Sequence, residues 1–268
     1  QKGENKKGLD YVEEALKINL DHDTLDSKAV ALFNLKRYAE SKECYEKIFE
    51  LTENEQDMVW IGTCLKEMGL KEENKSKKQK YYEDGIKIFN LILEKNAQHS
   101  DSWYYKGIIN WNLKKYNDAK KCQIEAIKIN PADPYYWQEL GDIANKQGNT
   151  DQAIIYFNKS KQIEPDVYTH NEIGKNFYNK EEYTKAINHF DQALQINNNS
   201  RSLIEKGNAL FMISKYEKIN SWNDAIACYD EALKIGQEDR DAFGNKGNAL
   251  REMKKYDDAI ENLNPLLT

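Results

Sequence analysis

The sequence predicts an all-α protein, built as a solenoid of antiparallel helix pairs, from three observations. Small residues recur along the first helix of each expected pair, in steps of 33, 45, 34, 33, 33 and 40 residues. A second series of small residues keeps the same register along the second helices. With only 4 Pro and 13 Gly in 268 residues, the chain has little room for long loops. The first series is Ala29, Gly62, Gly107, Gly141, Gly174, Gly207 and Gly247, and the second is Ser41, Gly85, Ala119, Ala153, Ala186, Ala225 and Ala259.

The small residues are expected to lie where the two helices of a pair approach each other closely. Gly inside a helix costs about 1 kcal/mol relative to Ala, so its recurrence indicates a packing requirement. Three residues before the second series, mostly aromatic residues are expected to begin the second helices: Tyr38, Tyr82, Tyr116, Thr150, Tyr183, Trp222 and Tyr256. Four residues after it, side chains on the same face are expected to dock on the next first helix: Tyr45, Phe89, Gln123, Phe157, Phe190, Tyr229 and Leu263.

Taken in order, the chain begins with a partial unit. Residues 1–21 contain a second-helix pattern with no first helix before it, so this segment is either the second helix of a truncated repeat or an N-terminal cap. Repeats are then expected at 22–54, 55–99, 100–133, 134–166, 167–199 and 200–239, with a C-terminally incomplete one at 240–268. Because solenoids need capped ends for solubility, the uncapped last repeat suggests a segment of a longer protein.

Two long steps in the first series locate two insertions. The first adds about eleven residues at 70–80, where five Lys and two Glu follow Leu70. It is interpreted as a solvated helix extension or loop, and the functional alternative is a basic contact for an acidic partner. The second insertion, at 216–221, adds six residues and is expected to be structural.

The stretch from Trp137 to Pro165 organises the chain. It has the form Trp137-x₂-Leu140-Gly141-x₂-Ala144, then Ala153-x₃-Phe157, and it closes with Pro165. This pattern resembles the tetratricopeptide repeat (TPR), a helix–turn–helix unit of about 34 residues with Trp, Leu-Gly, Tyr, Ala, Phe and Pro as its signature. The resemblance extends over nearly all of residues 8–268 and implies a right-handed superhelix of about seven full repeats.

In the TPR family the first helices line a concave groove that binds peptides or extended protein segments. The resemblance therefore implies a non-catalytic scaffold or adaptor, with groove positions three before, one after and four after each first-helix small residue. The predicted partner-binding residues, two flanking tyrosines included, are Tyr104, Trp111, Tyr135, Gln138, Tyr168, Asn171, Lys175, Tyr178, Asn208, Phe211, Asn248 and Arg251. Aromatic rings supply contact area and amides can hydrogen-bond a peptide backbone. The alternative is that several of these rings pack between repeats.

One activity of the family, a clamp for the terminal carboxylate of a chaperone tail, is not expected here. The matching positions from the Gly174 repeat onward hold Asn171 and Lys175, then Glu205, then Asp241 and Asn245. The two acidic residues would repel a carboxylate.

No constellation in the sequence predicts catalysis, a cofactor or a metal site. The histidines are dispersed, and none pairs with another ligand at metal spacing; they are His22, His99, His170 and His189. Three of the 4 cysteines, Cys44, Cys122 and Cys228, fall at one repeat position, which indicates a buried site on the second helix. Free thiols favour a reducing interior, so a cytoplasmic location is expected.

Charge and hydropathy narrow the class of partner. The net charge of −6 disfavours a nucleic-acid partner, and no apolar run approaches the roughly 18 residues that insertion into a membrane requires. The expected partner is a protein or peptide, and self-association through the uncapped repeat ends is also considered. Two alternatives remain. One is a substrate-recruiting arm of a larger enzyme or multi-subunit assembly; the other is a pentatricopeptide-like RNA binder, which the Gly and Ala positions and the acidic balance disfavour.

Overall fold

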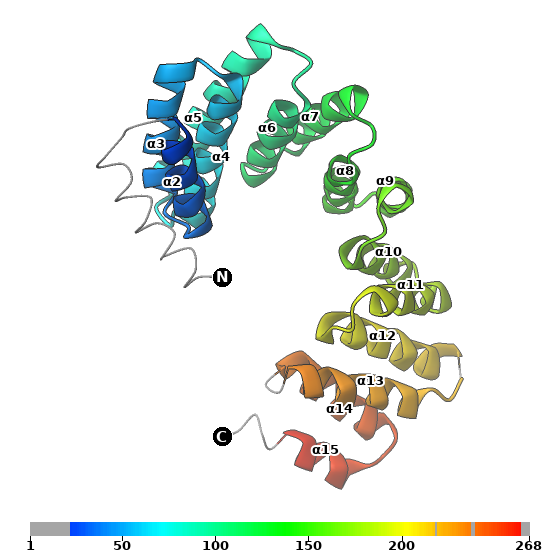
Figure 1. Cartoon of the computed structure of the whole chain (residues 1–268). Helices are drawn as coiled ribbons and strands as arrows, with labels where there is room; N and C mark the ends of the chain where they lie inside the picture. The colour runs from blue at the N-terminus through cyan, green and yellow to red at the C-terminus, as the bar shows by residue number, and fades with distance from the viewer. Residues whose placement is uncertain (1–21, 218, 237–238, 264–268) are drawn as a thin grey trace. The chain divides into compact units, whose positions relative to one another are not determined.

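The structure is a computed structural model that describes residues 22–217, 219–236 and 239–263. Over these residues the chain consists of α-helices joined by short connections, with one π-helical turn and no strand (Figure 1). The second-helix pattern predicted at 1–21 lies outside the described residues.

Two compact units divide the chain at Glu139 and Leu140, inside α8. The first unit contains α2 (His22–Asn34), α3 (Tyr38–Thr52), α4 (Glu55–Lys71), α5 (Lys75–Lys95), α6 (Ser100–Asn112) and α7 (Tyr116–Ile129), and α8 (Pro134–Lys146) begins in it. The second contains α9 (Thr150–Ile163), α10 (Val167–Asn179), α11 (Tyr183–Ile196), α12 (Ser200–Met212), the π-helical turn η1 (Ile213–Glu217), α13 (Trp222–Ile235), α14 (Arg240–Glu252) and α15 (Tyr256–Leu263).

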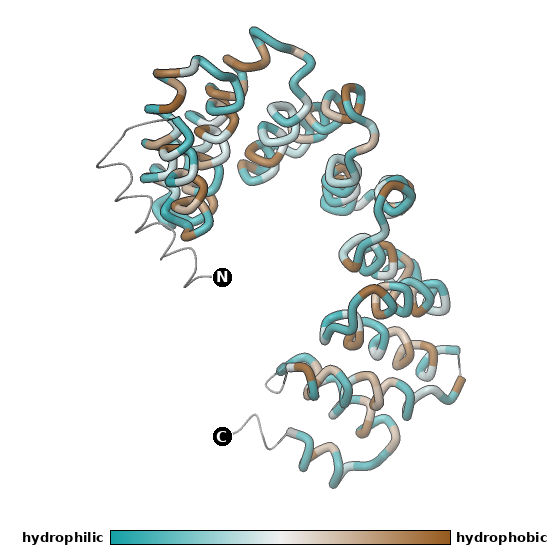
Figure 2. The backbone as a smooth tube through the Cα atoms, in the orientation of Figure 1, coloured by the Kyte–Doolittle hydropathy of each residue, from teal (hydrophilic) through white to brown (hydrophobic). Residues whose placement is uncertain are grey.

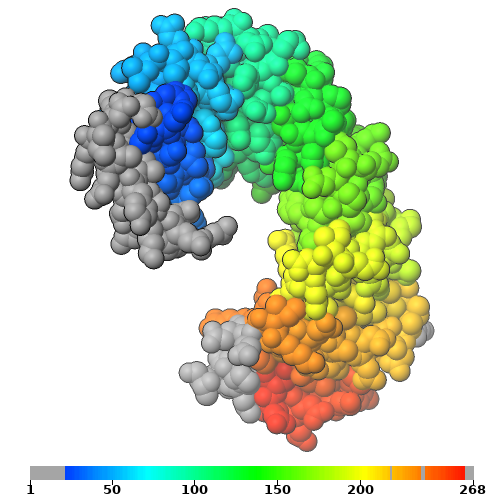
Figure 3. Space-filling view, viewed as in Figure 1, coloured from blue at the N-terminus to red at the C-terminus, as the bar shows by residue number. Residues whose placement is uncertain are grey.

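Within each unit, consecutive helices pack as antiparallel pairs. In the second unit, α10 packs on α11, α12 on α13 and α14 on α15, and each second helix also packs on the first helix that follows it. Figure 3 shows these pairs in contact in chain order, and the first unit repeats the arrangement from α2 to α7. The predicted all-α solenoid of helix pairs is confirmed.

Four first-helix glycines, Gly62, Gly141, Gly174 and Gly207, lie directly beneath buried rings of the second helices, whereas Gly107 lies beneath Gln123. A Cβ atom built on Gly174 would lie 2.6 Å from the ring of Phe190, which is fully buried. Phe190 also packs in one cluster with Ala209 of the next first helix, α12. Each such ring therefore fills the space between its own first helix and the next, as predicted, and it requires a residue without a side chain beneath it.

The connections inside the pairs share one backbone turn. A residue with positive φ stands two positions before the second helix in five pairs: Lys36, Lys114, Gly148, Glu181 and Lys254. The predicted starting residues begin α3, α7, α9, α11, α13 and α15. Tyr82 is the exception, because α5 begins seven residues earlier, at Lys75. In the five pairs with a positive-φ residue, the left-handed backbone at that residue lets the chain reverse direction within one short connection.

The first insertion extends both helices of its pair. The helix α4 has 17 residues and α5 has 21, whereas α6 and α7 have 13 and 14. Only Glu72, Glu73 and Asn74 connect them, and Asn74 caps α5 by accepting from the backbone N–H groups of Ser76 and Lys77. Of the two forms considered for this segment, the structure therefore has the helix extension. Figure 2 colours the backbone by hydropathy, and residues 71–80 of this extension are all hydrophilic.

All four cysteines are buried and free, and the buried second-helix site expected for Cys44, Cys122 and Cys228 is confirmed. Burial raises the pKa of the Cys64 and Cys228 thiols to about 11. In the described part of the chain, no helix combines the length and apolar character needed to cross a membrane.

Candidate functional site

The second unit presents a surface formed by its first helices, which we call the first-helix face: the side chains of α10, α12 and α14, with Asp142 at the end of α8 nearest to them. Side chains on neighbouring first helices contact one another along this face. The predicted groove residues that belong to it are Tyr168, Asn171, Lys175, Tyr178, Asn208, Phe211, Asn248 and Arg251.

At the N-terminal end of this face, Tyr168 of α10 bonds to Asp142 of α8. The phenol O–H lies 2.6 Å from each carboxylate oxygen, and the ring remains 40% exposed. Burial raises the pKa of Asp142 to about 6, although the Tyr168 hydrogen bond acts in the opposite direction. Tyr168 thus has a fixed orientation and still offers one side of its ring to a partner.

Charged side chains join α10 to α12. The Lys175 ammonium lies 2.8 Å from Glu172 and 3.8 Å from Glu205, and burial raises the pKa of the Glu205 carboxyl. Because these acids compensate Lys175 within the surface, the lysine is not available to a partner's carboxylate. This geometry agrees with the sequence argument against a carboxylate clamp.

Asn171 has a packing role that the sequence pattern does not show. Its side chain is buried, and its Oδ1 accepts from the Ser202 hydroxyl at 2.9 Å. This bond ties α10 to α12 beneath the first-helix face. The register does not signal this bond, because the position of α12 that corresponds to Asn171 holds Ile204, and Ser202 stands two residues before it.

A cavity of about 220 Å³ lies between α10, α12 and α14, which we call the amide pocket. Its walls are rings and amides, and four of them belong to the predicted set; the lining residues are Tyr178, Asn208, Phe211, Met212, Tyr229, Asn245 and Asn248. The sequence pattern missed three of them. Tyr229 was identifiable in principle, because it carries a hydroxyl where the two preceding repeats have Phe157 and Phe190.

Hydrogen bonds fix the amides of this pocket in one orientation. Asn208 Oδ1 accepts from both the Tyr229 hydroxyl and Asn245 Nδ2, each at 2.9 Å. The Asn208 Nδ2 donor and the Asn245 Oδ1 acceptor have no partner among the described residues, and neither has the exposed Asn248 side chain. A donor and an acceptor side by side match the two hydrogen-bonding groups of a peptide unit.

The aromatic members of the predicted set also pack within their own repeats. The Phe211 ring meets Trp222 at 5.1 Å between centroids, and the Tyr178 ring meets Tyr183 at 5.5 Å, both edge to face. Each ring at the end of a first helix therefore rests on the ring that begins the second helix. Both rings are thus packed within their own repeats, and both also line the amide pocket.

At the C-terminal end of the face, a second cavity of about 410 Å³ lies between α14 and α15. Asn248 lines this cavity as well as the amide pocket, and Arg251 stands on its wall. Both side chains are exposed.

The remaining predicted residues belong to the first unit and are described separately. Tyr104 packs against Tyr136 at 5.1 Å between centroids, and burial is the main cause that raises its pKa. Trp111 packs edge to face on Tyr116. Tyr135 is 57% exposed and Gln138 is half-buried.

Within the described ranges, no group of three or more His, Cys, Asp and Glu side chains is arranged to hold a metal ion. His170 and His189 lie close together as a pair, with their Nδ1 atoms 3.4 Å apart.

Comparisons with known proteins agree with this architecture. The tetratricopeptide repeat family model matches residues 23–55, 100–133, 134–167 and 167–200, and a second tetratricopeptide repeat model matches 216–264. These matches cover more than half of the chain. The chain belongs to the tetratricopeptide repeat family.

Two curated relatives are much longer than this chain. A TPR repeat-containing protein of Methanocaldococcus jannaschii, MJ1428, is 27% identical over 263 residues, which are 96% of this chain and 45% of that protein. Protein O-mannosyl-transferase TMTC3 of Homo sapiens is 26% identical over 143 residues, 52% of this chain and 15% of that protein. The chain thus spans less than half the length of each.

Two solved structures share the fold. Yeast Tom70 superposes with a TM-score of 0.66 at 18% identity, covering 98% of this chain and 55% of Tom70. YrrB, described as a TPR protein with an unusual peptide-binding site, superposes with a TM-score of 0.57 at 15% identity, covering 76% of this chain and 98% of YrrB. At these identities the likeness is one of fold. The fold and the family together define a protein-interaction repeat scaffold.

Proposed function

We propose that the chain is a non-catalytic scaffold or adaptor that binds an extended peptide or protein segment on the first-helix face of the second unit. The observation that carries the proposal is the amide pocket. Asn208 and Asn245 are already held in place by the bonds among Tyr229, Asn208 and Asn245, so binding does not have to order these two amides, and among the described residues they keep a donor and an acceptor without a partner. Preorganised groups of this kind bind at a lower entropic cost than flexible ones.

The bound segment would lie along the face rather than at one point of it. Tyr168 supplies an exposed ring at one end, Tyr178 and Phe211 border the amide pocket, and Asn248 and Arg251 extend the surface to the second cavity. Lys175 and Asn171 would support this surface and not contact the partner directly. In the first unit, Tyr135 and Gln138 with Tyr104 and Trp111 would form a separate contact.

A second candidate is that the chain is the recruiting arm of a larger enzyme or multi-subunit assembly. The similarity to 15% of a mannosyl-transferase favours this alternative, because repeats of this type accompany an enzyme there. A coding sequence that continues beyond Thr268 into a catalytic domain would support it. In either case, four buried free thiols fit a reducing compartment, and we place the chain in the cytoplasm.

The proposal is tested by affinity capture with matched variants. Asn248→Ala/Arg251→Ala removes two exposed side chains of the first-helix face. Ile155→Ala removes an exposed side chain on α9, a second helix. A protein retained by the wild type and by Ile155→Ala but lost by the double variant would support the first-helix face. Loss with Ile155→Ala alone would place binding on the second helices and contradict the proposal.

A further inference from the structure

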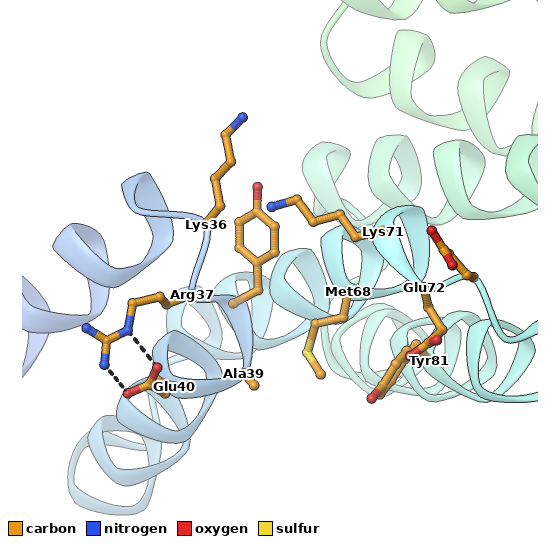
Figure 4. A pocket seen from close by; sticks show the side chains of 10 residues that line it. Lys36, Arg37, Ala39, Glu40, Met68, Lys71, Glu72 and Tyr81 are labelled. Carbon is orange, nitrogen blue, oxygen red and sulfur yellow. Dashed lines mark hydrogen bonds and ion pairs between the residues drawn. The ribbon is translucent and has the colours of Figure 1, made fainter. Parts of the chain in front are cut away.

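The extended α4–α5 hairpin borders a cavity in the first unit that the first-helix face of the second unit does not include. The cavity has a volume of about 520 Å³ and is formed by the α2–α3 connection, the first turn of α3, the last turn of α4 and Tyr81 of α5. Tyr38, Met68 and Tyr81 supply its apolar surface. Lys36 and Lys71 approach it from opposite sides (Figure 4). We call it the hairpin pocket.

The lysines of the hairpin pocket carry charge that no acidic side chain of the described residues pairs with. Neither Lys36 nor Lys71 has an ion-pair partner among the described residues, and the Lys71 ammonium lies 4.5 Å from the centroid of the Tyr38 ring. Arg37 differs, because its guanidinium binds the Glu40 carboxylate, with Nε 2.6 Å from Oε1 (Figure 4). Two ammonium groups without a carboxylate partner in the described part of the chain therefore flank an aromatic surface, and one of them lies over the Tyr38 ring.

The start of α5 adds to this charge. It contains Lys75, Lys77, Lys78 and Lys80, none of which forms an ion pair in the described structure, and it has no acidic residue in its first turn. Cations at a helix N-terminus oppose the helix dipole, so these lysines do not stabilise the start of α5. In a chain with a net charge of −6, a basic cluster at an unfavourable position points to a role outside folding.

We propose that the hairpin pocket and the lysines at the start of α5 bind an acidic protein segment. An apolar side chain of that segment would pack on Tyr38, Met68 and Tyr81, and carboxylates on either side of it would meet Lys36 and Lys71. A protein segment fits better than a nucleic acid, because Glu40, Glu72 and Glu73 also line the cavity and would repel a continuous row of phosphates. An apolar residue between spaced carboxylates can avoid them.

The chain offers a matched control for the charges. The sequence Leu35-Lys36-Arg37-Tyr38 recurs as Leu113-Lys114-Lys115-Tyr116, at the same turn of another pair and without an extended hairpin. Lys36 and Lys114 have nearly the same φ, 64° and 60°, and Glu181 adopts 62° at the equivalent position, so Glu is tolerated there. Lys36→Glu/Lys71→Glu and Lys114→Glu/Lys115→Glu therefore change the net charge equally.

The experiment measures fluorescence anisotropy of a labelled peptide with glutamates on both sides of a central phenylalanine, titrated with the full chain. We expect binding that weakens with salt. Lys36→Glu/Lys71→Glu should weaken it by about tenfold or more, whereas Lys114→Glu/Lys115→Glu should leave it unchanged. Circular dichroism verifies that both variants remain folded.

Three results would overturn the proposal. They are no binding of the peptide by the wild type, equal weakening by the two variants, and preferential binding of a single-stranded oligonucleotide or of anionic lipid vesicles that Lys36→Glu/Lys71→Glu abolishes. Capture by the first-helix face is independent of these outcomes, because the Asn248→Ala/Arg251→Ala variant retains the hairpin pocket.

Discussion

His170 of α10 and His189 of α11 face each other with their Nδ1 atoms 3.4 Å apart. One ring must donate and the other accept, so at least one of the two imidazoles must be neutral for the contact to form. Burial is the main cause that lowers the pKa of both, and it brings the pKa of His189 to about 4. Lys161 acts in the same direction, and Asp166 opposes it at His170. We therefore expect the contact between α10 and α11 at this pair to weaken at acidic pH.

The first prediction concerns pH. Folding lowers the pKa of both histidines below the unfolded value of about 6.5, so the unfolded state binds more protons and the free energy of unfolding falls as the pH drops from 6.5 towards 4. Asp142 acts oppositely, because its raised pKa makes the folded state bind a proton more readily. We therefore compare the wild type with His189→Gln in urea. Between pH 7 and pH 5 the wild type should lose about 2 kcal/mol more than the variant. Parallel pH profiles would show that the pair does not behave as described.

The second prediction concerns the glycines beneath the rings. Gly174→Ala places a methyl group against the buried Phe190 ring, and overpacking of this kind costs about 1–3 kcal/mol. This cost exceeds the gain of about 1 kcal/mol in helix propensity, so the urea midpoint should fall. Gly244→Ala is the control, since nothing lies within 4 Å of a Cβ built there, and its midpoint should rise. A higher midpoint for both variants would mean that the close contact is not needed.

The third prediction concerns the thiols. Burial raises the pKa of Cys64 and Cys228 to about 11, and burial also raises that of Cys44 and Cys122. Because the thiolate is the reactive form, the native protein should resist a disulfide reagent at pH 8. In urea all 4 thiols should react within the dead time of the same assay. Rapid labelling of a native thiol would identify a site that opens locally.

The repeat pattern predicted the parts of this fold that depend on local register. Gly174 and Phe190 illustrate this, because a residue without a side chain is identifiable from its spacing alone, and the ring that fills the space follows at a fixed distance. The helical insertion at α4 and α5 was located from the same spacing, but its conformation remained open between extension and loop.

The candidate site was less predictable, because it depends on how neighbouring first helices pair their side chains. Asn171 and Lys175 both stand at groove positions. On the next helix, however, Ser202 donates a hydrogen bond to Asn171, and Glu205 lies within ion-pair distance of Lys175. Asn245 stands outside the predicted positions, yet it lines the amide pocket through its bond to Asn208. Such pairings depend on how far apart two helices lie in space. The spacing of residues along the sequence does not give that distance.

The central claim is that a partner segment lies on the first-helix face, and site-specific photo-crosslinking tests it most directly. Benzoylphenylalanine is placed at Phe211, beside the amide pocket, or at the exposed Ile155 of α9, and each protein is irradiated with the captured partner. We expect a covalent adduct from position 211 and none from position 155. An adduct from position 155 with none from position 211 would contradict the account and place the partner on the second helices.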